Sequence, residues 1–200
     1  MDLIGSEQIQ GRASLAGNLC NASPAADSVP AMFAAGAIAV VAGSKGRREV
    51  PVEQIPTAPG RTSLAKDEFI LEIKFPARPQ RSSDAYLRFI PRTEMDIAVV
   101  GCGISVTLDA GGTCTAARVA IGAVAPTVLL VKDAADALIG HKLDAETLAK
   151  LDAAARAACK PINDKRGTIE YRTKVAGVLA RRVAAIAFDR AMGKAQRTSH

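Results

Sequence analysis

Hydrophobic and polar residues alternate in a way that predicts strands in the first half of the chain and helices in the second. Apolar, β-branched runs separated by Gly- and Pro-containing segments predict strands at 37–41, 68–75, 85–90, 96–108 and 114–121. Apolar residues at helical spacing predict helices over 133–139, 144–159 and 168–192. Strands followed by helices indicate an α+β fold.

The turns between these runs predict two hairpins. The run at 37–41 returns through GSKGRR, and the run at 96–108 returns through DAGGT. Residues 54–66 contain two prolines and read as an irregular loop. A domain boundary is expected between residues 80 and 92, where a Pro-, Ser- and Arg-rich loop separates two groups of strands.

The beginning of the chain is dominated by a long run of small residues. SLAGNLCNASPAADSVP, at 14–30, has neither helical nor strand periodicity, and no clear element precedes it. We therefore expect a loop, followed by a short helix that begins at Pro30 and ends at Gly36.

Charge and composition exclude few function classes. The net charge is +6 and the pI about 9.4, but the positive residues are spread along the chain and aromatic residues make up 4%. Solvated faces explain this pattern better than a nucleic-acid groove with stacking platforms. No signal peptide and no membrane span is visible, so a cytoplasmic protein is expected.

The cysteines and histidines do not predict a metal site. The four cysteines, at positions 20, 102, 114 and 159, show no C-x-x-C spacing, and both histidines lie far from them in sequence. Reduced structural thiols in a reducing compartment are expected. No residue pattern indicates a catalytic nucleophile or acid–base pair in this chain.

Taken by itself, the segment around Gly17 has two interpretations. It could be a surface turn, or its backbone amides could hold a phosphate, because glycine lets a ligand approach the backbone closely. Ser14 and Asn18 could add side-chain contacts, and Asp27 could accept from a ribose or ribityl hydroxyl. The segment is not GxGxxG and follows no clear strand, so it does not indicate a Rossmann site.

Several segments in register resemble one protein family. SLAGNLCNASPAADSVP is similar to the second FAD-binding motif of the flavoprotein subunits of molybdenum hydroxylases, the carbon monoxide dehydrogenase and xanthine dehydrogenase type. DEFILEIKFP, YLRFIPRTEMDIAVVGCGISV, IGAVAPT and PINDKRGTIEYRTKVAGVLARR follow in the family's order. The resemblance covers most of the chain.

The resemblance implies where FAD would bind. Residues Ser14, Leu15, Ala16, Gly17 and Asn18 would line the pyrophosphate, and Asp27 would bond the ribityl or ribose part. Ile70 would pack near the isoalloxazine, and Arg88 would reach the flavin ring and stabilise the anionic reduced form. Without the resemblance, Ile70 reads as strand core and Arg88 as a member of a surface salt bridge.

The resemblance also implies a domain plan. Residues 1–80 would form the second FAD-binding subdomain of a PCMH-like flavoprotein fold, with a mostly antiparallel sheet. Residues 81–193 would form the C-terminal domain, a three-stranded antiparallel sheet with a helical bundle, and 194–200 a disordered tail. In that domain Arg166, Gly167, Glu170, Tyr171 and Arg172 are expected to tie helix to sheet or to contact a partner subunit.

Three features depart from the family pattern. Ala16 stands where glycine is common, and 128–130 (VLL) replaces a segment that often contains Pro and Arg. Nothing corresponds to the first FAD-binding subdomain, so the sequence resembles the C-terminal part of a longer subunit.

Two functions remain open on this basis. The first is an FAD-binding electron-transfer subunit that works with a [2Fe–2S] small subunit and a molybdopterin-binding large subunit, as a heterotrimer or a dimer of heterotrimers. The second is a truncated fragment that does not bind FAD alone and acts as a structural interaction module. The substrate and the electron acceptor are not predicted.

Overall fold

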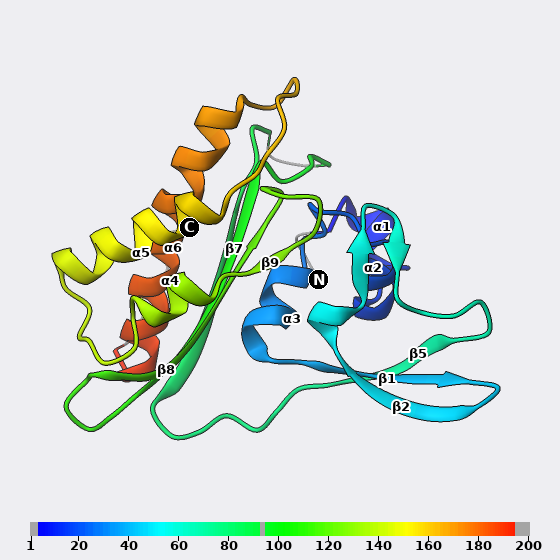
Figure 1. The fold of residues 1–200 in the computed structure, drawn as a ribbon, viewed down its shortest axis with the longest axis horizontal. Coiled ribbons are helices and arrows are strands. Elements are labelled where there is room, and N and C mark those ends of the chain that lie inside the picture. Colours follow the sequence, from blue (N-terminus) through cyan, green and yellow to red (C-terminus); the bar gives the residue numbers. More distant parts are fainter. Residues whose placement is uncertain (1–3, 93–94, 195–200) are drawn as a thin grey trace.

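The computed structural model describes residues 4–92 and 95–194, which form two main antiparallel sheets and a two-stranded ribbon, with helices between and beside the main sheets (Figure 1). Helix α3 (Val29–Ala35) lies between the sheets. The larger sheet carries the C-terminal helices on its opposite face. The α+β fold expected from the sequence is confirmed. Of the tail expected at 194–200, only Lys194 belongs to the described residues.

The smaller sheet is built from the first predicted hairpin and one later strand. Its order is β2-β1-β5, and all neighbours are antiparallel. The strands are β1 (Ile38–Gly43), β2 (Gly46–Pro51) and β5 (Phe69–Lys74). Residues 54–66 were expected to form an irregular loop, and this expectation is wrong. They contain a small ribbon of β3 (Pro56–Ala58) and β4 (Arg61–Thr62), which follows the 3-10 turn η1 (Val52–Gln54). Strands of two and three residues leave no periodic signal in the sequence.

The N-terminal segment is more helical than its sequence predicts. It contains α1 (Glu7–Gln10) and α2 (Leu15–Cys20) before α3. The expectation of an unstructured loop at 14–30 is therefore wrong for its first third and its end. Helix α3 is as predicted: proline opens it, and Gly36 ends it with a left-handed φ of 66°.

The larger sheet has the order β6-β7-β8-β9 and is antiparallel throughout. Its strands are β6 (Ser82–Phe89), β7 (Val100–Leu108), β8 (Cys114–Gly122) and β9 (Leu129–Leu130). The three long strands match the expected three-stranded sheet. The fourth strand, β9, was not expected from the sequence. It lies in the segment 128–130, which departs from the family pattern.

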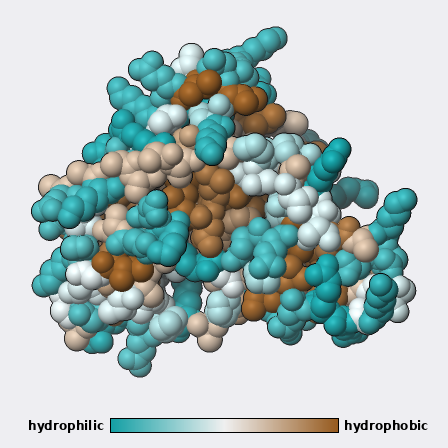
Figure 2. All heavy atoms as spheres, in the orientation of Figure 1, coloured by the Kyte–Doolittle hydropathy of each residue, from teal (hydrophilic) through white to brown (hydrophobic). Residues whose placement is uncertain are grey.

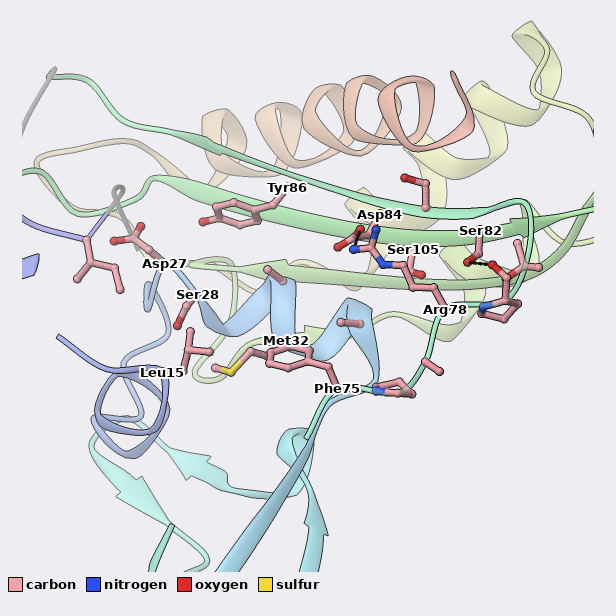
Figure 3. Close-up of a pocket in the computed structure, with 18 residues that line it drawn as sticks. Leu15, Asp27, Ser28, Met32, Phe75, Arg78, Ser82, Asp84, Tyr86 and Ser105 are labelled. Atoms are coloured by element: carbon pink, nitrogen blue, oxygen red, sulfur yellow. Dashed lines mark hydrogen bonds and ion pairs between the residues drawn. The ribbon is translucent and has the colours of Figure 1, made fainter. Parts of the chain in front are cut away.

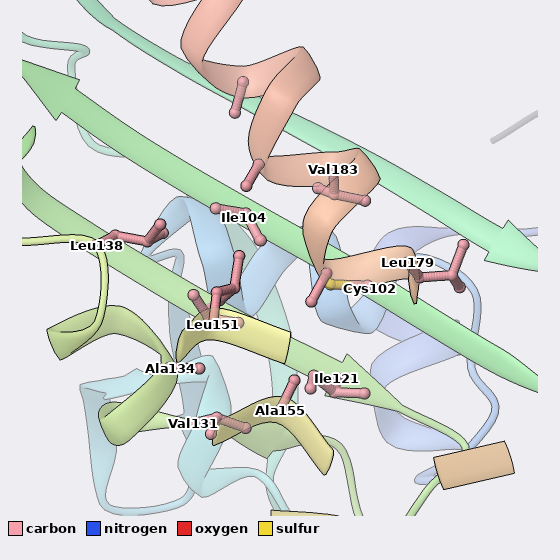
Figure 4. Close-up of a cluster of buried hydrophobic side chains, with 14 of the residues drawn as sticks. Cys102, Ile104, Ile121, Val131, Ala134, Leu138, Leu151, Ala155, Leu179 and Val183 are labelled. Carbon is pink, nitrogen blue, oxygen red and sulfur yellow. The ribbon is translucent and has the colours of Figure 1, made fainter. Parts of the chain in front are cut away.

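Three helices cover one face of the larger sheet. They are α4 (Lys132–Asp136), α5 (Ala145–Ala158) and α6 (Ile169–Ala191). The side chains of Asp144 and Thr168 accept backbone N–H groups and cap α5 and α6. Alternate residues of β7 point into this core, among them Cys102 and Ile104, which pack with Leu151 of α5 and Leu179 of α6 (Figure 4).

The opposite face of the larger sheet receives α3. A β-carbon on Gly103 would lie 2.6 Å from the carbonyl oxygen of Pro30, and one on Gly122 would lie 2.9 Å from Cγ of the same proline. The two glycines therefore let α3 approach the sheet closely. Ala120, from β8, contributes to the core that α3 shares with the smaller sheet.

Arg172 connects α6 to the sheet, as expected for its motif. Its side chain is 5% exposed and pairs with Asp164 at 2.6 Å. Its Nη1 donates to the carbonyl oxygen of Val99, at 2.9 Å, just before β7 begins. Asp96 and Arg166 pair nearby at 3.3 Å. These contacts join the β6–β7 connection to the loop before α6.

Hydrophilic residues cover most of the face in Figure 2, with separate hydrophobic patches between them. Within residues 4–92 and 95–194, no helix has the length and apolar character needed to cross a membrane.

Candidate functional site

The segment expected to line a phosphate forms the first turn of a helix. Ser14 is extended and its Oγ accepts the N–H of Gly17 at 3.0 Å, which makes it the N-cap of the six-residue helix α2. The amides of Leu15 and Ala16 begin this helix, and the first amides of a helix have no intrahelical acceptor. A β-carbon on Gly17 would lie 3.0 Å from Ser14 Oγ.

Asn18 fixes the chain that follows α2. Its Oδ1 accepts the N–H of Ser28 at 3.1 Å and the Ser28 hydroxyl at 2.6 Å. These two hydrogen bonds hold the beginning of α3 against α2. Asp27, the residue before Ser28, is placed by the same contacts.

Asp27 and Arg88 form an ion pair between the two halves of the molecule. Asp27 Oδ1 lies 2.9 Å from Arg88 Nη1, and the side chains are 14% and 10% exposed. Burial raises the pKa of Asp27, and the Arg88 guanidinium opposes this rise. The structure thus brings together two residues 61 positions apart in sequence (88 − 27) that were both expected to contact FAD.

Tyr86 adds a polar group that the sequence reasoning missed. It lies on β6 two residues before Arg88, and residues at i and i+2 of a strand share one face. Its hydroxyl end points toward Asp27 (Figure 3). Burial raises the pKa of the phenol well above its ordinary value, and the negative charge of Asp27 adds to the effect. The hydroxyl is therefore a neutral donor at physiological pH.

In this cluster Asp27 Oδ1 and Arg88 Nη1 are buried and pair with each other, whereas the buried Tyr86 Oη has no hydrogen-bond partner among the described residues. A buried polar atom without a partner is rare in folded proteins because it costs desolvation energy. An unpartnered hydroxyl beside a buried ion pair is typical of a site that binds a polar ligand. Sequence could have signalled Tyr86 only through its shared strand face with Arg88.

A pocket of about 410 Å³ opens beside this cluster, between α2, α3 and β6 (Figure 3). Asp27, Ser28 and Tyr86 line it, together with apolar groups that include Leu15, Met32 and Phe75. Pockets of this size and mixed character are typical of small-molecule and cofactor sites.

Ile70 is not among the residues that line this pocket. It lies on β5, half-buried, and packs against the core shared by α3 and the smaller sheet. Of the predicted site residues, Leu15 and Asp27 line the pocket and Arg88 pairs with Asp27, whereas Ile70 belongs to a neighbouring surface.

Neither a disulfide nor a metal cluster occurs in the part of the chain that the structure describes. All four cysteines are free thiols. No group of three or more His, Cys, Asp or Glu side chains is arranged there to hold a metal ion.

Comparison with known families gives two matches that together span most of the chain. Residues 1–78 match the FAD binding domain in molybdopterin dehydrogenase, and residues 85–187 match the CO dehydrogenase flavoprotein C-terminal domain. Each match covers one of the two sheets.

Individual relatives agree with the family matches. The chain is 32% identical over 194 residues to the carbon monoxide dehydrogenase medium chain of Afipia carboxidovorans, covering 97% of this chain and 65% of that one. It is 29% identical over 194 residues to a putative xanthine dehydrogenase FAD-binding subunit of Escherichia coli, covering 96% of this chain and 66% of that one.

The fold is also similar to solved structures. A chain in the carbon monoxide dehydrogenase structure from Hydrogenophaga pseudoflava superposes with a TM-score of 0.89 at 32% identity, covering 94% of this chain and 65% of that chain. The present chain therefore spans about 65–66% of the length of these relatives.

Proposed function

The chain belongs to the FAD-binding medium subunits of the carbon monoxide dehydrogenase and xanthine dehydrogenase family, and we propose that it binds FAD as the electron-transfer subunit of a molybdenum-containing hydroxylase or dehydrogenase. The observation that carries the proposal is the buried Asp27–Arg88 pair beside the unpartnered hydroxyl of Tyr86, with Asp27 and Tyr86 at the edge of a pocket. Bound FAD would supply the electron-transfer chemistry.

The residues present fit such a cofactor. The pocket combines apolar walls, which suit a flat ring system, with the Asp27 carboxylate and the unpartnered Tyr86 hydroxyl. Arg88 carries the positive charge and further N–H donors. In our proposal this charge stabilises negative charge on the ring, while Asp27 holds the guanidinium in place and accepts from the cofactor.

We assign the pyrophosphate to the beginning of α2. The amides of Leu15 and Ala16, the hydroxyl of Ser14 and the Asn18 side chain are the donors offered there, and Gly17 keeps the turn free of a side chain. Ala16 adds one methyl group where the family commonly has none. Ile70 would pack against the isoalloxazine from β5, which its half-buried position permits.

The partners in this proposal follow from the relatives. The matched family of residues 1–78 is an FAD binding domain of molybdopterin dehydrogenases, and the carbon monoxide dehydrogenase of Hydrogenophaga pseudoflava is an enzyme with a molybdenum cofactor, whose Mo-pyranopterin moiety is missing in the similar structure. We propose a [2Fe–2S] small subunit and a molybdopterin-binding large subunit as partners, in a heterotrimer or a dimer of heterotrimers in the cytoplasm. Residues 1–80 would hold FAD with the first residues of the 81–193 domain.

A flavin titration of the purified chain tests the proposal. We expect the chain to become yellow on addition of FAD, to keep the flavin through gel filtration and to bind it with a stoichiometry near one. A chain that stays colourless after incubation with excess FAD would show that it does not bind the cofactor by itself, and the proposal would fail for this chain.

The variant Gly17→Val tests the α2 assignment within that experiment. The added side chain would meet Ser14 Oγ and cover the backbone at the turn, so we expect at least a tenfold loss of FAD affinity. Gly11→Val is the matched control, because Gly11 has an ordinary φ of −61° and lies outside the pocket. Equal FAD retention by the two variants would contradict the assignment of the pyrophosphate to α2.

A further inference from the structure

The Tyr86 side chain reaches along the sheet toward Arg88. Tyr86 lies opposite Gly103 in the β6–β7 register, yet its hydroxyl oxygen lies 3.0 Å from where a β-carbon on Gly101 would stand. Gly101 is the partner of Arg88 in the same register. The Tyr86 hydroxyl therefore occupies the space that a side chain at position 101 would fill, next to the Arg88–Gly101 pair of the sheet.

The hydroxyl has no protein partner in that place. Tyr86 Oη is buried and has no hydrogen-bond partner among the described residues, although the acceptor carboxylate of Asp27 faces it across the edge of the pocket (Figure 3). A phenol that served packing alone would be replaced without loss by phenylalanine, since a buried, unpaired hydroxyl destabilises a fold.

Asp27 and Tyr86 thus lie at one end of the pocket, and Arg88 pairs with Asp27 beside it. Arg88 and the neutral phenol of Tyr86 are donors, and Asp27 is an acceptor that faces both. A complementary ligand presents a carbonyl oxygen, an N–H group and a second carbonyl oxygen along one edge. The pyrimidine edge of an isoalloxazine ring has this order of groups.

We propose that Tyr86 positions the flavin by donating its hydroxyl hydrogen bond to a carbonyl oxygen of the pyrimidine edge, beside Arg88 and Asp27. The proposal rests on the FAD-binding function argued above and adds a residue to it. It also assigns the Asp27 carboxylate to the ring N–H, and not to a ribityl or ribose hydroxyl as the resemblance implies.

The chain contains two tyrosines and no tryptophan, which supplies a matched control. Tyr171 lies on α6, is 43% exposed and makes an edge contact with Phe89, away from the pocket. Tyr86→Phe and Tyr171→Phe each remove one hydroxyl and leave the ring. Binding of riboflavin and FAD to the purified chain is measured by equilibrium dialysis, and thermal unfolding is measured without flavin.

We expect Tyr86→Phe to bind riboflavin about tenfold more weakly, whereas Tyr171→Phe binds it as the parent does. Without flavin, we expect Tyr86→Phe to melt at the same temperature as the parent or higher, because it loses an unpaired buried hydroxyl. A hydroxyl with a structural role would give the opposite result, a lower melting temperature.

Flavin analogues identify the contacted atom. Replacing the ring C2 or C4 carbonyl oxygen by sulfur removes a good acceptor. The tenfold penalty of Tyr86→Phe should disappear for one of the 2-thio and 4-thio flavins and persist for the other. The 3-methyl flavin, which lacks the ring N–H, should bind the parent more weakly.

The outcomes separate this inference from the function on which it rests. If the parent binds FAD but Tyr86→Phe binds riboflavin within twofold of it, or weakens all flavins equally, the Tyr86 role is overturned and the FAD function stands. If the parent binds neither FAD nor riboflavin, the proposed function fails and the Tyr86 role fails with it.

Discussion

The carbonyl oxygen of Pro30 lies 2.6 Å from the position that a β-carbon on Gly103 would occupy. Carbon and oxygen atoms that are not bonded do not approach so closely, so only glycine fits at this place in β7. The first residues of α3 thereby rest directly on the backbone of the larger sheet. This contact sets the spacing between the two halves of the molecule, and so the distance between Asp27, just before α3, and Arg88 on β6.

Gly103→Ala should therefore destabilise the fold. The nearest atoms are backbone atoms of Pro30 and Ala31, which cannot rotate away, so α3 must shift from the sheet. We expect a loss of about 1–3 kcal/mol in the free energy of unfolding, measured by urea denaturation. Gly11→Ala is the control, expected to change stability by less than about 0.5 kcal/mol. Equal stability of both variants would contradict the close contact.

Arg118 forms a second connection between the two halves. From β8, its Nε donates to the carbonyl oxygen of Phe33 near the end of α3, at 2.9 Å, and its Nη2 pairs with Glu53 at 3.0 Å. A cation at a helix C-terminus also stabilises the helix dipole. We expect Arg118→Met to lower the free energy of unfolding by about 1–2 kcal/mol.

Chemical denaturation of Arg118→Met beside Arg182→Met checks this expectation. Arg182 lies on the exposed side of α6, and its replacement should have little effect. If the two substitutions cost the same, Arg118 does not connect the halves.

Long helices and strands could be predicted from the sequence because the pattern of apolar residues that identifies each of them lies within the element itself. The helices α5 and α6 repeat their apolar face over several turns, and capping residues Asp144 and Thr168 mark where they begin. Strands of six to nine residues, such as β5 and β7, are long enough to show their composition.

The missed elements are short and depend on distant contacts. Helix α2 has only six residues, and it is held by the Ser14 cap, by the buried side chain of Leu19 and by the Asn18–Ser28 hydrogen bonds, whose partners are ten residues apart. Strand β9 has two residues and exists only because β8 offers an edge. Propensity carries little information on such elements.

In the candidate site, too, individual residues could be predicted from the sequence, but their contacts with distant residues could not. Asp27 and Arg88 were singled out through a family resemblance, but their pairing depends on how α3 packs on β6, which no local pattern encodes. Tyr86 was missed because a single tyrosine in a strand looks like ordinary core. Only its unpaired hydroxyl, visible in the folded chain, distinguishes it.

The Asp164–Arg172 pair should make the free energy of unfolding depend on pH. Burial acts to raise the pKa of Asp164, but the hydrogen bond and charge of Arg172, together with hydrogen bonds from the backbone of Arg166 and Gly167, outweigh it, so the folded-state pKa lies below the usual value of 3.8. A carboxyl whose pKa falls on folding contributes stability above its unfolded pKa and loses it as pH falls through the folded pKa. The contribution should be present at pH 7 and decline below about pH 4.

Asp164→Asn tests that dependence. We expect it to cost about 2 kcal/mol at pH 7, because Arg172 is 95% buried (100 − 5) and would lose its charged partner. The difference from the parent should shrink when urea unfolding is repeated near pH 3. A cost that stays constant between the two pH values would mean that the charge of Asp164 contributes nothing.

The four free thiols should differ strongly in reactivity toward Ellman's reagent. Burial raises the pKa of Cys102, which is fully enclosed in the core, and raises the pKa values of Cys114 and Cys159 to about 11. Only the thiolate reacts, and at pH 8 a thiol with a pKa of about 11 is ionised to roughly one part in a thousand. Burial raises the pKa of Cys20 as well, but this thiol is partly exposed on α2, a short helix.

We therefore expect Cys20 to react first in the native chain at pH 8, Cys159 to react slowly through its small thiolate fraction, and the buried Cys102 and Cys114 to react only at the rate of unfolding. Cys20→Ser should remove the first phase and leave the slow ones unchanged, whereas Cys159→Ser should keep it. In 8 M urea all four thiols should react together. Rapid reaction of Cys102 in the native chain would mean that the core between β7 and α6 opens without global unfolding, because this side chain has no other route to the reagent.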